Sequence, residues 1–291
     1  MRYFKCFLIL GILGSLTVFS GCQSSQKREA ETQLIPDDKK SALSSQLTQN
    51  LVQAFGERED EVVRHYLKES IALLMASARG HTAGLGSVKV VVLETATPYI
   101  AAGIVDTIYV SVGMLEAIHY ENELAFILAT QIALLKEQAT VRNLANLQGH
   151  ELGSSLVTLP TTPIEPASDY LTKGWFQPGG LFDFGQETYL KAERTAVEII
   201  YAAKFDPRGA VTFVQRCSIN PFQQQMRALG KILPDFDSRI VQARESVAKL
   251  TPLRDPIVTS QAFEERLQSH LQVKKAKFKT KKKANAARGK S

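Results

Sequence analysis

Cysteine is scarce in this chain of 291 residues, which contains only Cys6, Cys22 and Cys217. Cys6 and Cys22 belong to an N-terminal segment with the features of an export signal, so Cys217 would have no partner within the mature chain. A framework of intrachain disulfide bonds is therefore excluded even in an oxidising compartment. The fold must be stabilised by the packing of hydrophobic residues, which make up 44% of the sequence.

The N-terminus also lacks a hydrophobic run long enough to span a bilayer. Residues 6–19 are uncharged and mostly apolar, but about 20 such residues are needed to cross the hydrocarbon core. Arg2 and Lys5 precede this run and two small residues follow it, which is the order of a secretory signal peptide. We therefore predict a signal peptide over residues 1–21 and export of the chain.

The end of this segment, Phe19-Ser20-Gly21-Cys22, resembles the bacterial lipobox, in which cleavage leaves an acylated cysteine at the new N-terminus. Several acyl chains on Cys22 would hold the protein to a membrane more firmly than one chain, which binds only marginally. By resemblance to sorted lipoproteins, Gln23 favours the periplasmic face of the outer membrane. Residues 22–40 are then the lipidated N-terminus and a polar, flexible tether. Ordinary cleavage with release is the alternative.

Acidic residues are absent from the C-terminal tail, residues 273–291, which carries nine lysines and arginines. Two of the 35 basic residues lie in the signal, so 24 basic residues face 29 acidic ones in the rest of the chain. Each lysine near an acidic membrane contributes on the order of 1 kcal/mol. The expected partners of the tail are anionic lipid head groups or acidic cell-wall polymers, and nucleic acid is disfavoured outside the cytoplasm. A solvated, disordered tail without a partner is the alternative.

The body of the chain, residues 41–272, alternates between helical and strand-like patterns. Two β-branched segments, 88–96 and 107–115, predict a small sheet, and the alternation along the second indicates a partly exposed strand. Apolar residues at helical spacing predict helices over 41–55, 58–79, 122–138, 187–203, 207–216, 221–231, 236–249 and 260–272. The fold class is therefore α+β, mainly helical with a small β-sheet.

Residues 146–187 contain many glycines and prolines and end in an aromatic cluster, with Trp175, Phe176, Phe182 and Phe184. A long loop of this kind usually forms a lid or a binding surface. The segment 174–184 could line a groove, or its rings could fill that groove.

The segment GIVDTIYVSVGMLEAIHYENELAFILATQIALLKE, residues 103–137, resembles the zinc metallopeptidases of the CAAX-prenyl-protease and HtpX type, in particular their periplasmic lipoprotein branch. Two later segments resemble the same family: KAERTAVEIIYAAKFDPRGAV, residues 191–211, and LPDFDSRI, residues 233–240. The resemblance implies a zincin-like domain over residues 41–272. In the family, a His-Glu-x-x-His helix binds Zn²⁺ and its glutamate acts on the metal-bound water.

The catalytic residues of that motif are replaced in this chain. Its two histidines and its glutamate fall on Thr130, Leu134 and Gln131, and the family's Glu-x-x-x-Asp falls on Tyr189 and Glu193. A leucine offers no lone pair and a glutamine amide does not titrate, so these residues form neither a tetrahedral zinc site nor a general base. We predict no catalytic residue, no metal and no cofactor here, with Leu134 and Ile127 compensating by apolar burial worth ~1.5–3 kcal/mol per side chain.

Other residues could in principle supply a metal site, namely His119, Glu121 and Glu123 before the helix and His150-Glu151 in the loop. The sequence thus predicts an inactive, lipid-anchored, metallopeptidase-like envelope protein that binds a polypeptide client or regulates envelope protein assembly. Such clefts take a polypeptide as an added strand at a sheet edge, expected here within residues 99–112. The alternatives are an active zinc metalloendopeptidase with non-standard ligands and a structural lipoprotein tethered by its basic tail.

Overall fold

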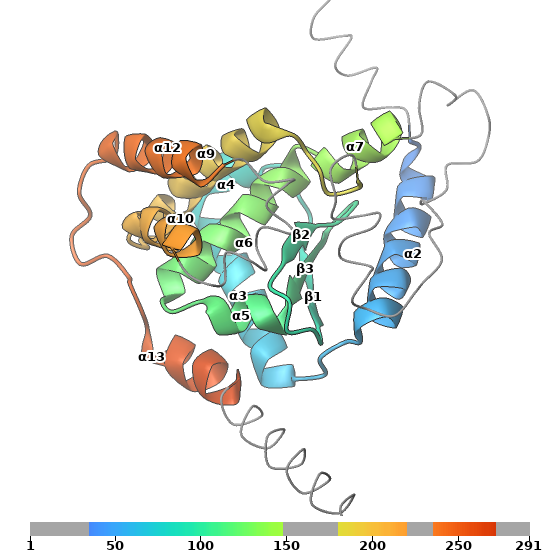
Figure 1. Cartoon of the computed structure of the whole chain (residues 1–291), viewed down its shortest axis with the longest axis horizontal. Coiled ribbons are helices and arrows are strands. Elements are labelled where there is room, and N and C mark those ends of the chain that lie inside the picture. Colours follow the sequence, from blue (N-terminus) through green and yellow to red (C-terminus); the bar gives the residue numbers. More distant parts are fainter. Residues whose placement is uncertain (1–34, 148–179, 220–234, 272–291) are drawn as a thin grey trace, which may run out of the picture.

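The computed structural model describes residues 35–147, 180–219 and 235–271, and these form a mainly helical α+β fold around a small three-stranded sheet (Figure 1). This confirms the predicted class. Several predicted features lie outside the described residues: the signal, Cys22, the basic tail, the helix over 221–231, His150, Glu151, Trp175 and Phe176.

The N-terminal helices are α2 (Asp37–Phe55), α3 (Glu61–Ser77) and the single turn α4 (Arg79–Thr82). Helix α2 begins at Asp37 rather than near Ser41, and Ile35 before it is buried. Pro36 precedes the helix and two aspartates lie in its first turn, where negative charge stabilises the free backbone N–H groups. The tether predicted over residues 22–40 therefore ends earlier than expected.

The sheet contains β1 (Lys89–Leu93), β2 (Ile100–Ala102) and β3 (Thr107–Ser111) in the order β1-β3-β2. β1 is parallel to β3, and β2 is antiparallel to it. All five residues of β3 are buried, so the prediction of a partly exposed second strand was wrong. The reason is that α2 covers the face of the sheet predicted to be exposed, where Tyr109 Oη lies 2.7 Å from Thr48 Oγ1.

Strand β3 also ends earlier than predicted, because α5 (Val112–Ala117) begins directly after it. The Ser111 hydroxyl caps this helix by accepting from the backbone N–H of Met114 at 3.0 Å. Gly113 is required here, because a Cβ at this position would lie 2.1 Å from the carbonyl oxygen of Ala96.

Helix α6 (Glu121–Lys136) runs through the centre of the molecule, between the sheet and a group of three C-terminal helices (Figure 1). Every residue from Glu121 to Leu135 is buried, including Ile127 and Leu134, as predicted for apolar compensation. Helix α7 (Ala139–Leu147) follows it, mostly over residues for which no element was predicted, and its last two residues lie in the predicted loop 146–187. Among the described residues, no single helix is long and apolar enough to cross a membrane; α6 and residues 139–145 pass that test only jointly, with a bend of 51°.

This group of three consists of α9 (Gln186–Ala202), α10 (Arg208–Ile219) and α12 (Phe236–Ala248). A short helical segment follows, made of α13 (Gln261–Phe263) and the π-helical η2 (Glu264–Gln268). Helix α9 makes the most extensive contact with α6, while α10 and α12 pack on each other and on these two. Thus α6, which contains Thr130, Gln131 and Leu134, and α9, which contains Tyr189 and Glu193, lie side by side.

Candidate functional site

The acidic residues at the start of α6 have structural partners. Glu121 accepts from the Tyr66 hydroxyl and from the backbone N–H of Ser260, both at 2.7 Å. Burial, reinforced by this hydrogen bond, raises the pKa of Tyr66 well above its ordinary value. Glu121 thereby ties α6 to α3 and to the chain before α13, and both of its carboxylate oxygens are engaged.

Glu123, one turn further along, accepts from the backbone N–H groups of His119 and Tyr120 at 3.0 and 3.3 Å. The same carboxylate is fully buried and forms an ion pair with Arg216 of α10, whose guanidinium also donates to the carbonyl of Ala117 at 2.5 Å. His119 itself is exposed. Within the described ranges no group of three or more His, Cys, Asp or Glu residues is arranged to hold a metal ion, and these carboxylates act as helix caps and ion-pair partners.

The three motif positions on α6 are buried. Thr130 is 2% exposed and its hydroxyl donates to the carbonyl of Phe126 at 2.9 Å, one turn back on the same helix. Leu134, four residues on and therefore on the same face, is completely buried. Neither side chain can coordinate zinc, because the hydroxyl of Thr130 is used within the helix and Leu134 has no donor atom.

Gln131, a residue of α6, lies close to Tyr189 of α9. Its side chain is 1% exposed, and neither its amide nitrogen nor its amide oxygen makes a hydrogen bond of good geometry with a described residue. Burial raises the pKa of Tyr189 to about 12, while the nearby Arg239 guanidinium and the Gln131 amide act in the opposite direction. The phenol thus stays protonated at neutral pH and is a poor metal ligand.

Glu193, one turn beyond Tyr189 on α9, forms a buried ion pair with Arg239 of α12. Its Oε1 atom accepts from Nη2 of Arg239 at 2.6 Å and from Nε at 2.9 Å, and both side chains are less than 5% exposed. The guanidinium carbon lies 5.6 Å from the ring centres of both Tyr189 and Phe236, within the range of cation–π attraction. Through this ion pair Glu193 and Arg239 join α9 to α12.

Cys217, on α10, borders the same cluster. Its thiol is buried, and burial raises its pKa to about 11, although Arg239 and Arg216 favour the thiolate. A protonated, buried thiol is a weak nucleophile and a weak metal ligand. It therefore adds no reactive group to the interface of Thr130, Gln131 and Leu134 of α6 with Tyr189 and Glu193 of α9, which we call the α6–α9 seam.

The described part of the aromatic segment is largely buried rather than exposed. Leu181 and Phe182 are 0% and 4% exposed, and Phe184 packs partly buried against the core. Asn143 of α7 holds this turn by donating to the carbonyls of Gly180 and Leu181 at 2.8 and 2.9 Å. Residues 180–184 therefore belong to the core and do not line an open groove.

Strand β2 is the edge strand closest to α6, as expected for an edge within residues 99–112. Its hydrogen bonds to β3 involve Tyr99 and Gly103, so the carbonyl of Ala102 points outward. That carbonyl accepts from the hydroxyl of Thr140 of α7 at 2.7 Å. Helix α7 thus occupies one end of this edge.

The buried amide of Gln131 gives a prediction for stability. Replacing Gln131 with methionine, of similar shape, is expected to raise the free energy of unfolding by about 1–2 kcal/mol, because it removes two buried polar atoms without good hydrogen bonds. Urea denaturation of both proteins measures the difference. Thr130→Val is the matched control: it removes a satisfied hydroxyl and should change stability by less than about 1 kcal/mol. A loss of stability in Gln131→Met would show that the amide is well bonded.

Sequence reasoning brought Gln131, Tyr189 and Glu193 to one seam but missed Arg216. Its partner Glu123 is far away in the sequence, and one basic residue on an amphipathic helix carries no signal of such pairing. Leu233 and Pro234 of the third resembling segment lie outside the described residues, whereas Arg239 is at the centre of the seam.

No family model matches the chain, and no curated protein matches its sequence.

Proposed function

We propose that this protein is a catalytically inactive, metallopeptidase-like lipoprotein of the bacterial envelope that binds polypeptides. The α6–α9 seam stabilises the fold and catalyses nothing. The role of the protein is to bind a polypeptide client or to regulate the assembly of envelope proteins. The observation that carries the proposal is the chemistry at the motif positions: Thr130 is bonded within its own helix, Leu134 is fully buried and Glu193 is neutralised by Arg239.

The donor set does not fit zinc. A catalytic zinc needs three protein ligands and an open position for water, whereas this seam offers a satisfied hydroxyl, an amide, a phenol with a pKa of about 12 and a carboxylate already paired with arginine. Hydrolysis also needs a group that accepts a proton from water near neutral pH. None of the described side chains in the seam has that property.

Polypeptide binding is supported by what remains open in the fold. Residues 180–184 fill the space beside α7, and Thr140 occupies part of the β2 edge, so the expected groove is closed at these points. The opposite edge of the sheet, strand β1, adjoins a surface groove. A sheet edge with unpaired backbone groups can take an extended segment without any catalytic group.

The inactive state is tested by metal content and cleavage. The full chain, purified from a zinc-containing medium and dialysed, is expected to contain far less than one zinc per molecule by elemental analysis, and to leave fluorescent casein uncut with or without a chelator. Stoichiometric zinc together with chelator-sensitive cleavage would replace this proposal with an active zinc metalloendopeptidase using other ligands.

A deletion distinguishes the third candidate, a structural lipoprotein held by its basic tail, from a protein held by its acyl chains. Removing residues 274–291 leaves lipidation at Cys22 intact, so envelope association in cell fractions should persist if the acyl chains provide the attachment. Release of the truncated protein would assign the attachment to the tail. In either case, casein binding by the purified chain reports separately on polypeptide binding.

A further inference from the structure

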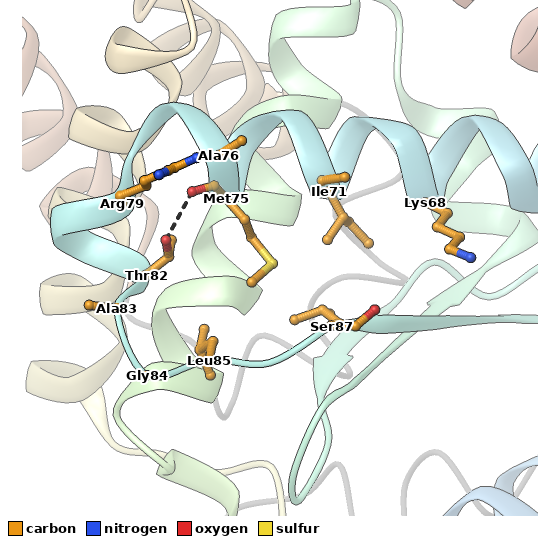
Figure 2. A pocket seen from close by; sticks show the side chains of 12 residues that line it. Lys68, Ile71, Met75, Ala76, Arg79, Thr82, Ala83, Gly84, Leu85 and Ser87 are labelled. Carbon is orange, nitrogen blue, oxygen red and sulfur yellow. Dashed lines mark hydrogen bonds between the residues drawn. The ribbon is translucent and has the colours of Figure 1, made fainter.

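A surface groove of about 570 Å³ lies between α3, α4 and the segment that leads into β1. Figure 2 shows α3 along one side of the groove and residues 82–87 along the other. Its floor is apolar and is formed by Ile71, Met75, Leu85 and Val88. It lies on the side of the sheet opposite to β2, so it is separate from the α6–α9 seam.

The rim of the groove is basic. Lys68 and Arg79 both line it, both are exposed, and neither forms an ion pair with any residue that the structure describes. The nearby His81 is engaged with Glu198 at 3.4 Å, and Lys136 donates to the carbonyl of Ala83 at the end of the groove. Outside the signal and the tail, the chain carries more acidic than basic residues. The rim of this groove is therefore positively charged although the rest of the body has a net negative charge.

The groove ends at Ser87 and Val88, directly before the edge strand β1. The backbone N–H of Lys89 donates to the carbonyl of Asp106, and hydrogen bonding alternates along a strand, so Val88 and Val90 direct their backbone groups away from β3. At Val92 the outward carbonyl accepts from the N–H of Arg58 at 2.7 Å. For Val88 and Val90 no such outward backbone bond is found among the described residues. The backbone groups on this first half of the edge are therefore unpaired within that part of the chain, although the two residues as a whole are only 4% and 8% exposed.

We propose that this groove and the unpaired first half of β1 together dock an extended polypeptide segment that carries a large apolar side chain flanked by acidic residues. The segment adds as a strand beside Val88 and Val90, its apolar side chain enters the groove over Ile71 and Met75, and its carboxylates meet Lys68 and Arg79. This inference rests on the proposed polypeptide-binding function and names the site and the class of segment that the site selects.

The test uses the full chain and a fluorescent octapeptide that alternates aspartate with leucine, with binding followed by fluorescence anisotropy. The variant Lys68→Glu/Arg79→Glu is expected to weaken binding by about tenfold or more, because attraction at two positions becomes repulsion. The matched control, Arg244→Glu/Lys249→Glu, reverses two exposed cations, one on α12 and one directly after it, and should bind as the wild type does. Both variants change exposed side chains only, and circular dichroism checks that they fold.

Two further probes test the apolar and backbone contacts. Ala72→Trp, at an exposed position of the groove wall, should block binding by filling the groove. An octapeptide N-methylated at alternate residues should bind at least about tenfold more weakly than the parent peptide, since it cannot pair with a strand edge. Equal binding by the Lys68→Glu/Arg79→Glu variant, or preference for an octapeptide with lysine in place of aspartate, would overturn the groove assignment.

Labelled, unfolded casein distinguishes the two levels of failure. If casein binds the wild type and the groove variants equally, the protein binds polypeptides elsewhere and only the groove assignment is wrong. If the wild type binds neither casein nor the octapeptide, the polypeptide-binding function is wrong as well. Loss of both interactions in the groove variants, with the α12 control unchanged, supports both.

Discussion

Replacing Arg239 with methionine is expected to lower the free energy of unfolding by about 3–5 kcal/mol, because it leaves the carboxylate of Glu193 buried without its partner. The pair is 3% and 4% exposed and is joined by two hydrogen bonds, so water cannot take over the lost interaction. Removing the guanidinium also removes its contacts with the rings of Tyr189 and Phe236. Chemical denaturation of the wild type and the variant measures the difference.

Two further variants separate the charge effect from simple loss of packing. The double variant Glu193→Leu/Arg239→Met removes both charges and should be within about 2 kcal/mol of the wild type, because an apolar pair can replace a buried ion pair. Lys191→Met breaks the more exposed pair with Glu137, in which the side chains are 56% and 34% exposed, and should cost less than about 1 kcal/mol. If Arg239→Met cost no more than Lys191→Met, the Glu193–Arg239 pair would not be buried as described.

The long helices could be predicted from the sequence because their signal is local. Helix α6 was predicted over residues 122–138 and spans Glu121–Lys136, and α9 was predicted over 187–203 and spans Gln186–Ala202. Each has a clear apolar pattern, and α9 follows Gly185 at a positive φ of 73°, a conformation that glycine adopts easily.

The sheet was predicted less well, because its details depend on tertiary partners. Strand β2 has only three residues and exists by pairing with β3, so its own composition carries little information. The polar atoms of Tyr109 and Ser111 suggested an exposed face, but Thr48 and the backbone of Met114 bind them inside the fold. Alternation of polar and apolar residues does not predict an exposed face where the polar side chains have specific hydrogen-bond partners inside the fold.

The candidate site was predictable as a set of positions but not as a set of contacts. Matching three segments to one family placed Gln131, Tyr189 and Glu193 together, and the structure brings these side chains to one seam. The pairing of Glu193 with Arg239, and the burial of Leu181 and Phe182 beside α7, depend on how α12 and α7 pack. Neither arrangement leaves a periodic pattern in the sequence.

Introducing the zinc ligands of the metallopeptidase family that the sequence resembles is expected to create a zinc site, if the proposed resemblance is correct. In the variant Thr130→His/Gln131→Glu/Leu134→His/Tyr189→Glu, two histidines four residues apart share a face of α6, and α9 supplies a carboxylate from the neighbouring helix. We expect one zinc per chain by elemental analysis. Zinc at about 1,000 times its dissociation constant should raise the free energy of unfolding by about 4 kcal/mol. Without zinc the variant should be less stable than the wild type, since it buries new polar and charged groups.

The control for this experiment moves one histidine out of register. In Thr130→His/Gln131→Glu/Leu135→His/Tyr189→Glu the two histidines are five residues apart, so they project from different sides of α6 and cannot share one ion. Both variants bury similar groups and should lose similar stability without metal, which leaves the zinc-dependent gain as the discriminating quantity. A folded first variant that takes up no zinc would mean that α6 and α9 do not have the metallopeptidase arrangement. The resemblance would then fail, whereas an inactive, polypeptide-binding role for the chain would stand or fall separately on casein binding.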